Sequence, residues 1–232
     1  MKYVKILGLA ALVTAALLSL AGTASATVLC SVEPSNGTPS TIGTVCPAGF
    51  AYPGGTELHS VLETNEHATF TDQNGKAAIT CTKSTIAATT ENEGSAIETV
   101  RLKVGTLTFE DCTSPALGTD VACEVKVLKN GTLELHWTAD SFHATITSSG
   151  TEITTDCPET LFGDVHCIYT TSSTDLGLLT GAAIQPESRG TLDIASAKLG
   201  ITKTSTWCPT EVKWDGKYEV TSPKTLWVAA HT

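Results

Sequence analysis

The sequence predicts an all-β fold: an antiparallel two-layer sandwich, Ig-like or jelly-roll-like, with disulfide-stapled hairpins. Apolar and polar residues alternate in short runs, as in TLELHW (132–137), and this period of two is typical of half-buried strands. No helical period persists for twelve residues after residue 26. Dipeptides that supply the positive φ angles of two-residue hairpins separate several runs: Asn74-Gly75, Asn130-Gly131, Ser149-Gly150 and Asp215-Gly216.

Residues 1–26 have the features of a signal peptide. A basic start and an apolar run precede Ala24-Ser25-Ala26, which matches the small-x-small pattern that signal peptidase recognises. A lipid anchor on Cys30 is the rival interpretation, and it is disfavoured because Leu29 stands where a lipobox has a small residue. We therefore expect a secreted protein, extracellular or on the cell surface, with no transmembrane segment in its mature chain.

Residues 27–55 predict an irregular N-terminal extension. The stretch is rich in Pro, Gly, Ser and Thr and contains Cys30 and Cys46, which we expect to close it into a loop. The remaining residues, 56–232, carry the strand pattern without a clear change in composition. They are expected to form one β-sandwich domain.

The cysteines predict a disulfide framework, because an even number in an exported chain is typical of one. Free buried thiols are the alternative. We expect all eight to be bonded: Cys30, Cys46, Cys81, Cys112, Cys123, Cys157, Cys167 and Cys208.

The densest cluster of reactive residue types is DCPETLFGDVHCIYTT, residues 156–171. Strand periodicity places Cys167 and His166 on opposite faces. That placement argues against a catalytic Cys–His pair or a shared metal, since both need side chains that converge. Cys157 and Cys167 are instead expected to bond across a hairpin.

The same reasoning favours a Cys112–Cys123 bond across the preceding hairpin. Cys81 and Cys208 then remain for a long-range bond. Pairing Cys81 with Cys112 and Cys123 with Cys208 is an open alternative, because spacing alone does not fix connectivity.

A second candidate site is a histidine pair. If 132–137 and 142–148 form a hairpin, His136 lies opposite His143 on the outer face, beside Glu134, and the three could bind zinc or copper. The competing interpretation is two partly exposed histidines with no metal. This register makes all three inward pairs apolar: Trp137–Phe142, Leu135–Ala144 and Leu133–Ile146.

Charge restricts the partners. The chain carries 14 Lys and Arg against 24 Asp and Glu, a net charge of −10, and Lys2 and Lys5 would leave with the signal peptide. Nucleic acid and anionic membranes are therefore disfavoured, because phosphate binding depends on basic side chains. An extracellular protein or a glycan is the expected partner class.

No enzyme template is present. The chain lacks a Gly-x-Ser-x-Gly elbow, a His-Glu-x-x-His helix, a P-loop and a Gly-x-Gly-x-x-Gly fingerprint, so no catalytic residue or cofactor is predicted. Trp207, Trp214 and Trp227 cluster near the C-terminus. They are expected to be core anchors, with a ligand platform as the alternative.

Several runs resemble a family of exported, cysteine-containing proteins from high-GC Gram-positive bacteria without a known activity. The resemblance covers about residues 75–230 and implies a secreted bacterial β protein, with no catalytic residue to transfer. The runs are TLELHW (132–137), TSSGTEITTDC (147–157), TLFGDVHCIY (160–169), TDLGLLTG (174–181) and YEVTSPKTLWVA (218–229).

Together these observations favour a non-enzymatic secreted or cell-envelope β module for adhesion or ligand binding. A secreted hydrolase acting on polysaccharide or peptide is the first alternative. A secreted protease inhibitor, with Ser114–Asp120 as its exposed loop, is the second.

Overall fold

The computed structural model describes most of the chain after residue 26. The described ranges are 27–34, 45–75, 77–95, 98–115, 121–138, 142–160, 163–181, 189–203 and 207–230. The predicted signal peptide lies outside them. The strands are β1 (Thr27–Cys30), β2 (Glu57–Leu62), β3 (Ala68–Thr71), β4 (Ala77–Thr90), β5 (Val100–Ser114), β6 (Val121–Lys129), β7 (Thr132–Trp137), β8 (His143–Ser149), β9 (Glu152–Thr160), β10 (Gly163–Thr170), β11 (Thr174–Thr180), β12 (Thr191–Lys203), β13 (Glu211–Ser222) and β14 (Trp227–Ala230).

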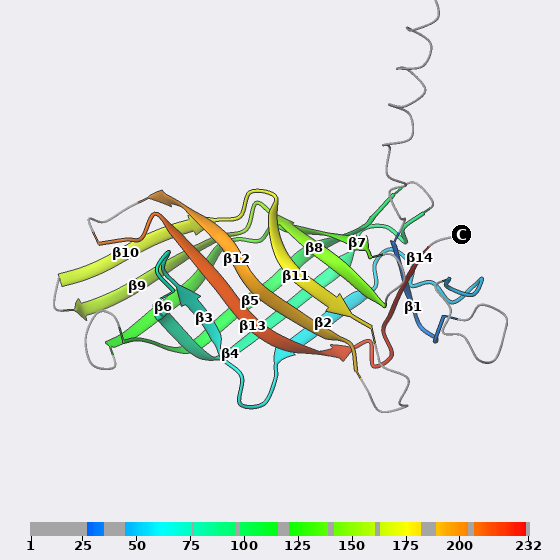
Figure 1. Ribbon diagram of the computed structural model, residues 1–232, viewed down its shortest axis with the longest axis horizontal. Coiled ribbons are helices and arrows are strands. Elements are labelled where there is room, and N and C mark those ends of the chain that lie inside the picture. The colour runs from blue at the N-terminus through cyan, green and yellow to red at the C-terminus, as the bar shows by residue number, and fades with distance from the viewer. Residues whose placement is uncertain are drawn as a thin grey trace, which may run out of the picture.

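Twelve of these strands, β2 to β13, form one antiparallel sheet that closes on itself (Figure 1). Along the chain it is a meander of eight courses, four of which are the long strands β4, β5, β12 and β13. The other four courses are each broken into two shorter strands: β2 with β3, β6 with β7, β8 with β9 and β10 with β11. Closure arises because β13 pairs with both β2 and β3, which also pair with β4.

The core fills the inside of the closed sheet. Side chains alternate between the two faces of a strand, so every second residue points inward, and these residues are mainly apolar. Aromatic rings occupy the middle of the core. Phe70, Phe109 and Trp214 pack on one another with ring centroids 5.2 to 6.4 Å apart. Tyr218 lies against Trp214 in an edge-on contact.

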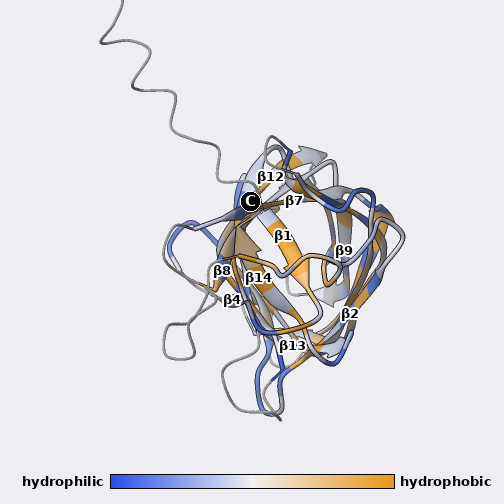
Figure 2. Cartoon of the chain, turned by 90° about the vertical axis from the view of Figure 1, so that its right-hand side faces the viewer, coloured by the Kyte–Doolittle hydropathy of each residue, from blue (hydrophilic) through white to orange (hydrophobic). Residues whose placement is uncertain are grey.

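A second, two-stranded sheet covers one end of the closed sheet. β1 pairs with β14, and the end-on view of Figure 2 shows the pair lying across the ring of strands. Leu29 and Val228 face the main core. The other side of the pair forms a small separate cluster with Cys46, Ala51 and Phe142. Thr27–Cys30, expected to be irregular, is thus a buried strand, because its apolar residues cover the core.

The predicted all-β antiparallel class with disulfide staples is confirmed. The two layers take the form of opposite walls of one closed sheet. β5, for example, pairs with β4 along one side and with β6 and β7 at its two ends on the other, so the strands form one sheet and not two.

Of the predicted hairpin dipeptides, Asn74-Gly75 does join two paired strands, β3 and β4. Asn130-Gly131 and Ser149-Gly150 do not, because β6 and β7 both pair with β5 and the chain continues in one direction. Asp215-Gly216 lies inside β13. Those three predictions were wrong because a flexible dipeptide permits a kink as readily as a reversal.

Four disulfides join the eight cysteines. Cys30–Cys46 agrees with the prediction. The predicted Cys157–Cys167, Cys112–Cys123 and Cys81–Cys208 bonds are wrong, and only the Cys81–Cys112 half of the alternative is right. The remaining observed bonds are Cys123–Cys157 and Cys167–Cys208.

The observed disulfide pairing follows from a row of cysteines across four neighbouring strands. This cysteine row consists of Cys81, Cys112, Cys123 and Cys157. Cys81 lies opposite Cys112, and Cys112 opposite Cys123. The Glu124–Asp156 pairing places Cys123 beside Cys157. A Cys112–Cys123 bond would leave Cys81 and Cys157 on strands too far apart to bond. The row therefore forms two disulfides, each between adjacent strands.

Candidate functional site

The candidate site begins with a change of phase in β5. Val100, Leu102 and Val104 face inward, but the next inward residues are Leu107 and Phe109. Further along the strand, the inward residues are again even-numbered, at Cys112 and Ser114. Two neighbouring exposed residues mark each change, and Asp111 has a left-handed φ of 51°. Residues 107–109 in the middle of β5 therefore have the opposite phase from its two ends. A β-bulge at Gly105 marks the first change, since Ala87 pairs with Thr106 and Ala88 with Val104, whereas at the second change β4 and β5 shift phase together without a change of register.

The neighbouring course, β6 and β7, keeps one phase throughout, with odd-numbered residues such as Cys123 and Leu135 inward. β5 pairs with β6 at residues 112–114 and with β7 at residues 100–103. In both stretches the two residue numbers of each pair add up to the same total. β5 therefore keeps one register against β6 and β7. In that register the inward Phe109 would face the outward Lys126.

A one-residue mismatch of phase prevents a ladder from forming. The strands therefore separate between residues 105–111 and 124–130, and the opening is called the β5–β6 groove. Asn130 Nδ2 donates to the Gly105 carbonyl across it at 2.7 Å, and Val104 N donates to the Gly131 carbonyl at its end. The groove has a volume of about 490 Å³.

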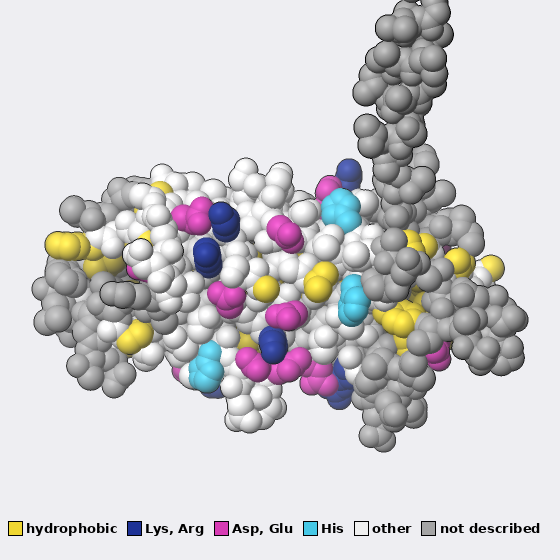
Figure 3. All heavy atoms as spheres, viewed as in Figure 1, with side chains coloured by type: hydrophobic (Ala, Val, Ile, Leu, Met, Phe, Trp, Pro, Cys, Tyr) yellow, Lys and Arg dark blue, Asp and Glu magenta, His cyan; other side chains and the backbone are white. Residues whose placement is uncertain are grey.

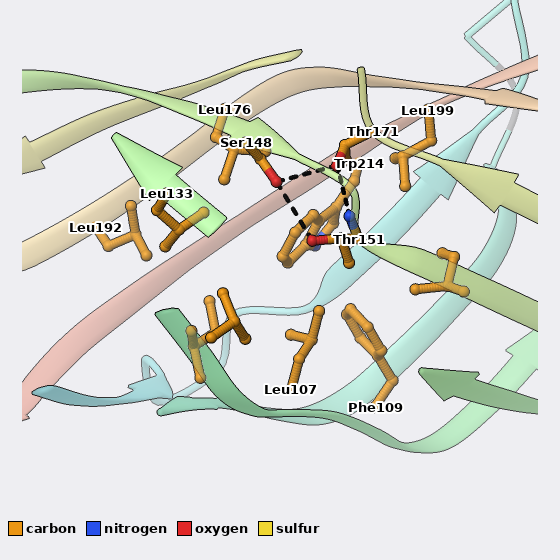
Figure 4. A pocket seen from close by; sticks show the side chains of 13 residues that line it. Leu107, Phe109, Leu133, Ser148, Thr151, Thr171, Leu176, Leu192, Leu199 and Trp214 are labelled. Atoms are coloured by element: carbon orange, nitrogen blue, oxygen red, sulfur yellow. Dashed lines mark hydrogen bonds between the residues drawn. The ribbon is translucent and has the colours of Figure 1, made fainter. Parts of the chain in front are cut away.

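Beneath the groove lies a small interior cavity of about 20 Å³. Leu107 and Phe109 line both the groove and the cavity. Figure 4 shows these two side chains on one side of the cavity and the polar side chains of the opposite wall on the other. Two rotatable side chains thus separate the core from the outer surface.

The polar part of the cavity wall is a cluster of three buried hydroxyls, Ser148, Thr151 and Thr171, here called the hydroxyl cluster. Ser148 Oγ lies 3.1 Å from Thr171 Oγ1 and 3.4 Å from Thr151 Oγ1. The Thr151 N–H donates to Thr171 Oγ1 at 3.1 Å (Figure 4). The other lining residues are apolar or aromatic side chains.

The hydroxyl cluster stands where neighbouring courses break at the same level. The Gly150 N–H donates to the Thr171 carbonyl, and the Thr171 N–H donates to the Thr151 carbonyl. These bonds hold the β8–β9 break against the β10–β11 break. Broken ladders need local partners for their backbone groups, which explains why short polar side chains gather at this point of an apolar core.

Charges near the groove are paired with one another. Lys83 Nζ lies 2.8 Å from Asp111, and Lys126 Nζ lies 2.6 Å from Glu124. The hydrogen bond with Asp111 and its charge raise the pKa of Lys83. On the face shown in Figure 3, acidic side chains lie beside Lys and Arg side chains rather than in one patch. Two charged residues line the groove itself: Lys126 is paired with Glu124, whereas Glu110 takes part in neither of these ion pairs.

Two aromatic groups in the core carry polar atoms in apolar surroundings. Burial raises the pKa of Tyr218 beyond its ordinary range, opposed by its bond with Ser84 and by the nearby Trp214 N–H. The Tyr218 hydroxyl donates to Ser84 Oγ at 2.9 Å, and Ser84 Oγ in turn donates to the Thr108 carbonyl. Trp214 Nε1 is buried and meets no acceptor in hydrogen-bonding geometry among the described residues.

The predicted histidine pair does not meet. The β7–β8 hairpin exists, but its register is shifted by two residues, with Trp137 opposite Ala144 and His136 opposite Thr145. His143 Nδ1 is instead 2.8 Å from Thr180 Oγ1. In the described part of the chain, no three His, Cys, Asp or Glu side chains gather as a metal site would need.

The prediction for residues 156–171 was partly right. His166 points outward and forms an ion pair with Asp156, whereas Cys167 is buried. Among the tryptophans, Trp214 and Trp227 are buried core residues, as expected. Trp207 is 53% exposed and does not belong to the core.

Sequence reasoning missed Leu107, Phe109 and the hydroxyl cluster. A signal for the first two was present, because the apolar positions of VRLKVGTLTFEDCTS (100–114) slip from even to odd and back. The hydroxyl cluster gave no local signal, since its members lie at the breaks of two different courses, β8–β9 and β10–β11.

Comparison with protein-family models, with curated proteins and with solved structures gave no match. Within the described ranges, the protein contains no helix that would be long and apolar enough for a membrane span.

Proposed function

We propose that the protein is a secreted, non-enzymatic binding module that takes up a small, mainly apolar ligand through the β5–β6 groove. Secretion is supported by the signal-peptide pattern of residues 1–26. It is also supported by four disulfides, which persist in oxidising compartments. The ligand class rests on the site itself.

The observation that carries the proposal is the position of Leu107 and Phe109 between groove and cavity. If both side chains turn outward into the groove, the cavity and the groove become one space, and no paired strand has to separate. A closed sheet of eight courses has an interior wide enough to hold one small ligand. The two changes of phase in β5 keep this passage open, because they prevent the ladder with β6 and β7 from closing.

The lining determines the ligand's chemistry. Apart from the hydroxyl cluster and the indole of Trp214, apolar side chains surround the cavity, and no charged residue lines it. Burying an unpaired charge in such surroundings is costly, whereas burying apolar surface is favourable. A neutral ligand of small cross-section fits these conditions.

Uptake of N-phenyl-1-naphthylamine, a neutral fluorophore that brightens in apolar sites, tests the proposal. We expect the wild-type protein to bind it slowly, because Leu107 and Phe109 must move. Phe109→Leu should bind it several-fold faster, since a smaller side chain opens the passage. Stopped-flow fluorescence measures both rates.

Phe70→Leu is the matched control. Phe70 is a buried aromatic residue of the same cluster but lines neither the groove nor the cavity. It should lower stability to a similar degree and leave the uptake rate unchanged. Absence of binding to both wild type and Phe109→Leu, or equal acceleration by both variants, would contradict the proposal.

The alternatives are tested on the same samples. Activity screens against glycan and peptide panels address a secreted hydrolase, and inhibition assays against secreted serine proteases address an inhibitor. The loop expected to act in an inhibitor, Ser114–Asp120, lies largely outside the described residues. Glycan-array binding addresses the expected glycan partner.

A further inference from the structure

The hydroxyl cluster has one more proton than its internal contacts use. Ser148, Thr151 and Thr171 each carry one O–H donor. Ser148 contacts each of the two threonines, and each contact uses one proton. Among the described residues, no other acceptor meets these three hydroxyls in a side-chain hydrogen bond. One buried O–H donor on the cavity wall is therefore left over.

The surplus donor belongs to the only group of hydroxyls among the described residues that line the apolar cavity, and all three of its members are buried. Buried donors without an acceptor cost free energy. The surplus group is a donor on the cavity wall, so the acceptor that satisfies it has to come from the cavity's occupant.

We infer that the interior site selects a neutral ligand carrying a hydrogen-bond acceptor, such as a ketone or ether oxygen, over a hydrocarbon of the same shape. This inference rests on the proposed function and names the ligand's chemistry. The same acceptor could come from a water molecule, because the cavity is large enough for one. The test therefore has to separate an acceptor on the ligand from a retained water.

Cyclohexanone and methylenecyclohexane form a suitable pair, since they differ by an oxygen in place of a CH₂ group. Each is titrated against bound N-phenyl-1-naphthylamine, and the ratio of the two dissociation constants is measured. Infrared spectroscopy of bound cyclohexanone gives an independent reading. A carbonyl stretch below its frequency in alkane shows that the oxygen accepts a hydrogen bond from the protein.

Variants identify the donor. The triple change Ser148→Ala, Thr151→Val and Thr171→Val removes every hydroxyl of the cluster. It should shift the ratio about five- to tenfold towards the hydrocarbon. Thr151→Val alone should keep the preference, because Ser148 and Thr171 together still have one proton to spare. Ser114→Ala is the control, since Ser114 is a fully buried serine that does not line the cavity.

The outcomes are distinguishable. If neither compound displaces the fluorophore, or the fluorophore does not bind, the proposed function fails. If both bind but the triple variant leaves the ratio unchanged, a retained water satisfies the cluster and the inference fails. If the triple variant does not fold, the infrared reading on wild type decides, and an unshifted carbonyl stretch overturns the inference.

Discussion

Gly131 has no room for a side chain. A Cβ there would lie 2.4 Å from both the Ser149 carbonyl oxygen and Thr151 Oγ1. The residue stands at the break between β6 and β7 and packs directly on the break between β8 and β9. Its contact with Thr151 links the end of the β5–β6 groove to the hydroxyl cluster.

We expect Gly131→Ala to lower the free energy of unfolding by about 1–3 kcal/mol, because backbone atoms would have to move to admit the methyl group. Chemical denaturation measures the change. The matched control is Gly200→Ala, since a Cβ at Gly200 meets no atom within 4 Å. Alanine there should be neutral or slightly stabilising, as expected for a glycine inside a strand. Equal losses in the two variants would contradict the steric explanation.

Among the elements, β5 shows how much of the candidate site a sequence contains. Its apolar positions reveal two changes of phase, one at Gly105-Thr106 and one at Glu110-Asp111. They do not reveal the groove, because a bulged strand can still be paired along both edges. The groove forms only because β6 and β7 keep their own phase while both ends of the pairing are fixed.

The cysteine row makes a prediction about pairing. In the double variant Cys81→Ser and Cys157→Ser, the remaining Cys112 and Cys123 lie directly opposite each other. Cross-strand neighbours have Cβ atoms about 4.5–5.5 Å apart, so we expect these two to form a disulfide. Peptide mapping by mass spectrometry under non-reducing conditions detects it.

The control variant is Cys81→Ser with Cys123→Ser, which leaves Cys112 and Cys157. β6 lies between their strands, so both should stay free thiols. A Cys112–Cys157 bond in that variant, or free thiols in the first one, would show that the row is not held in the described register.

In the whole molecule, the closed sheet and its β1–β14 cover create an interior in which tyrosines cannot ionise easily. Tyr169 and Tyr218 are 3% and 0% exposed. Burial raises the pKa of both hydroxyls above the ordinary tyrosine value, because a phenolate would lose its hydration. The effect requires the whole fold, since it disappears when the chain unfolds.

Stability should consequently fall at alkaline pH. Below the ordinary tyrosine pKa of about 10, both states keep their protons and the folded state has its full advantage. As the pH rises further, the unfolded chain ionises first, and stability is lost by about 1.4 kcal/mol per pH unit for each tyrosine. Denaturation at a series of pH values up to 11.5 measures this slope.

Tyr218→Phe should reduce the alkaline slope by the share of one tyrosine, although it also removes the bond with Ser84. Phe70→Leu serves as the control, because it weakens the same aromatic cluster without changing a titrating group. A slope that Tyr218→Phe leaves unchanged would exclude this tyrosine as a cause of alkaline destabilisation.

The amino-acid sequence was sufficient to predict the class of fold and the face on which many residues lie. Alternation predicted antiparallel strands, and it correctly turned Cys167 inward and His166 outward. The tertiary structure alone decided which neighbour each residue meets. An inward residue such as Cys112 or Cys123 has one strand on either side at a similar distance, and local sequence favours the one closer along the chain. The assembled sheet places Cys112 beside Cys81 on β4 and Cys123 beside Cys157 on β9. Such contacts between whole strands decided the disulfide pairing, the β5–β6 groove and the hydroxyl cluster.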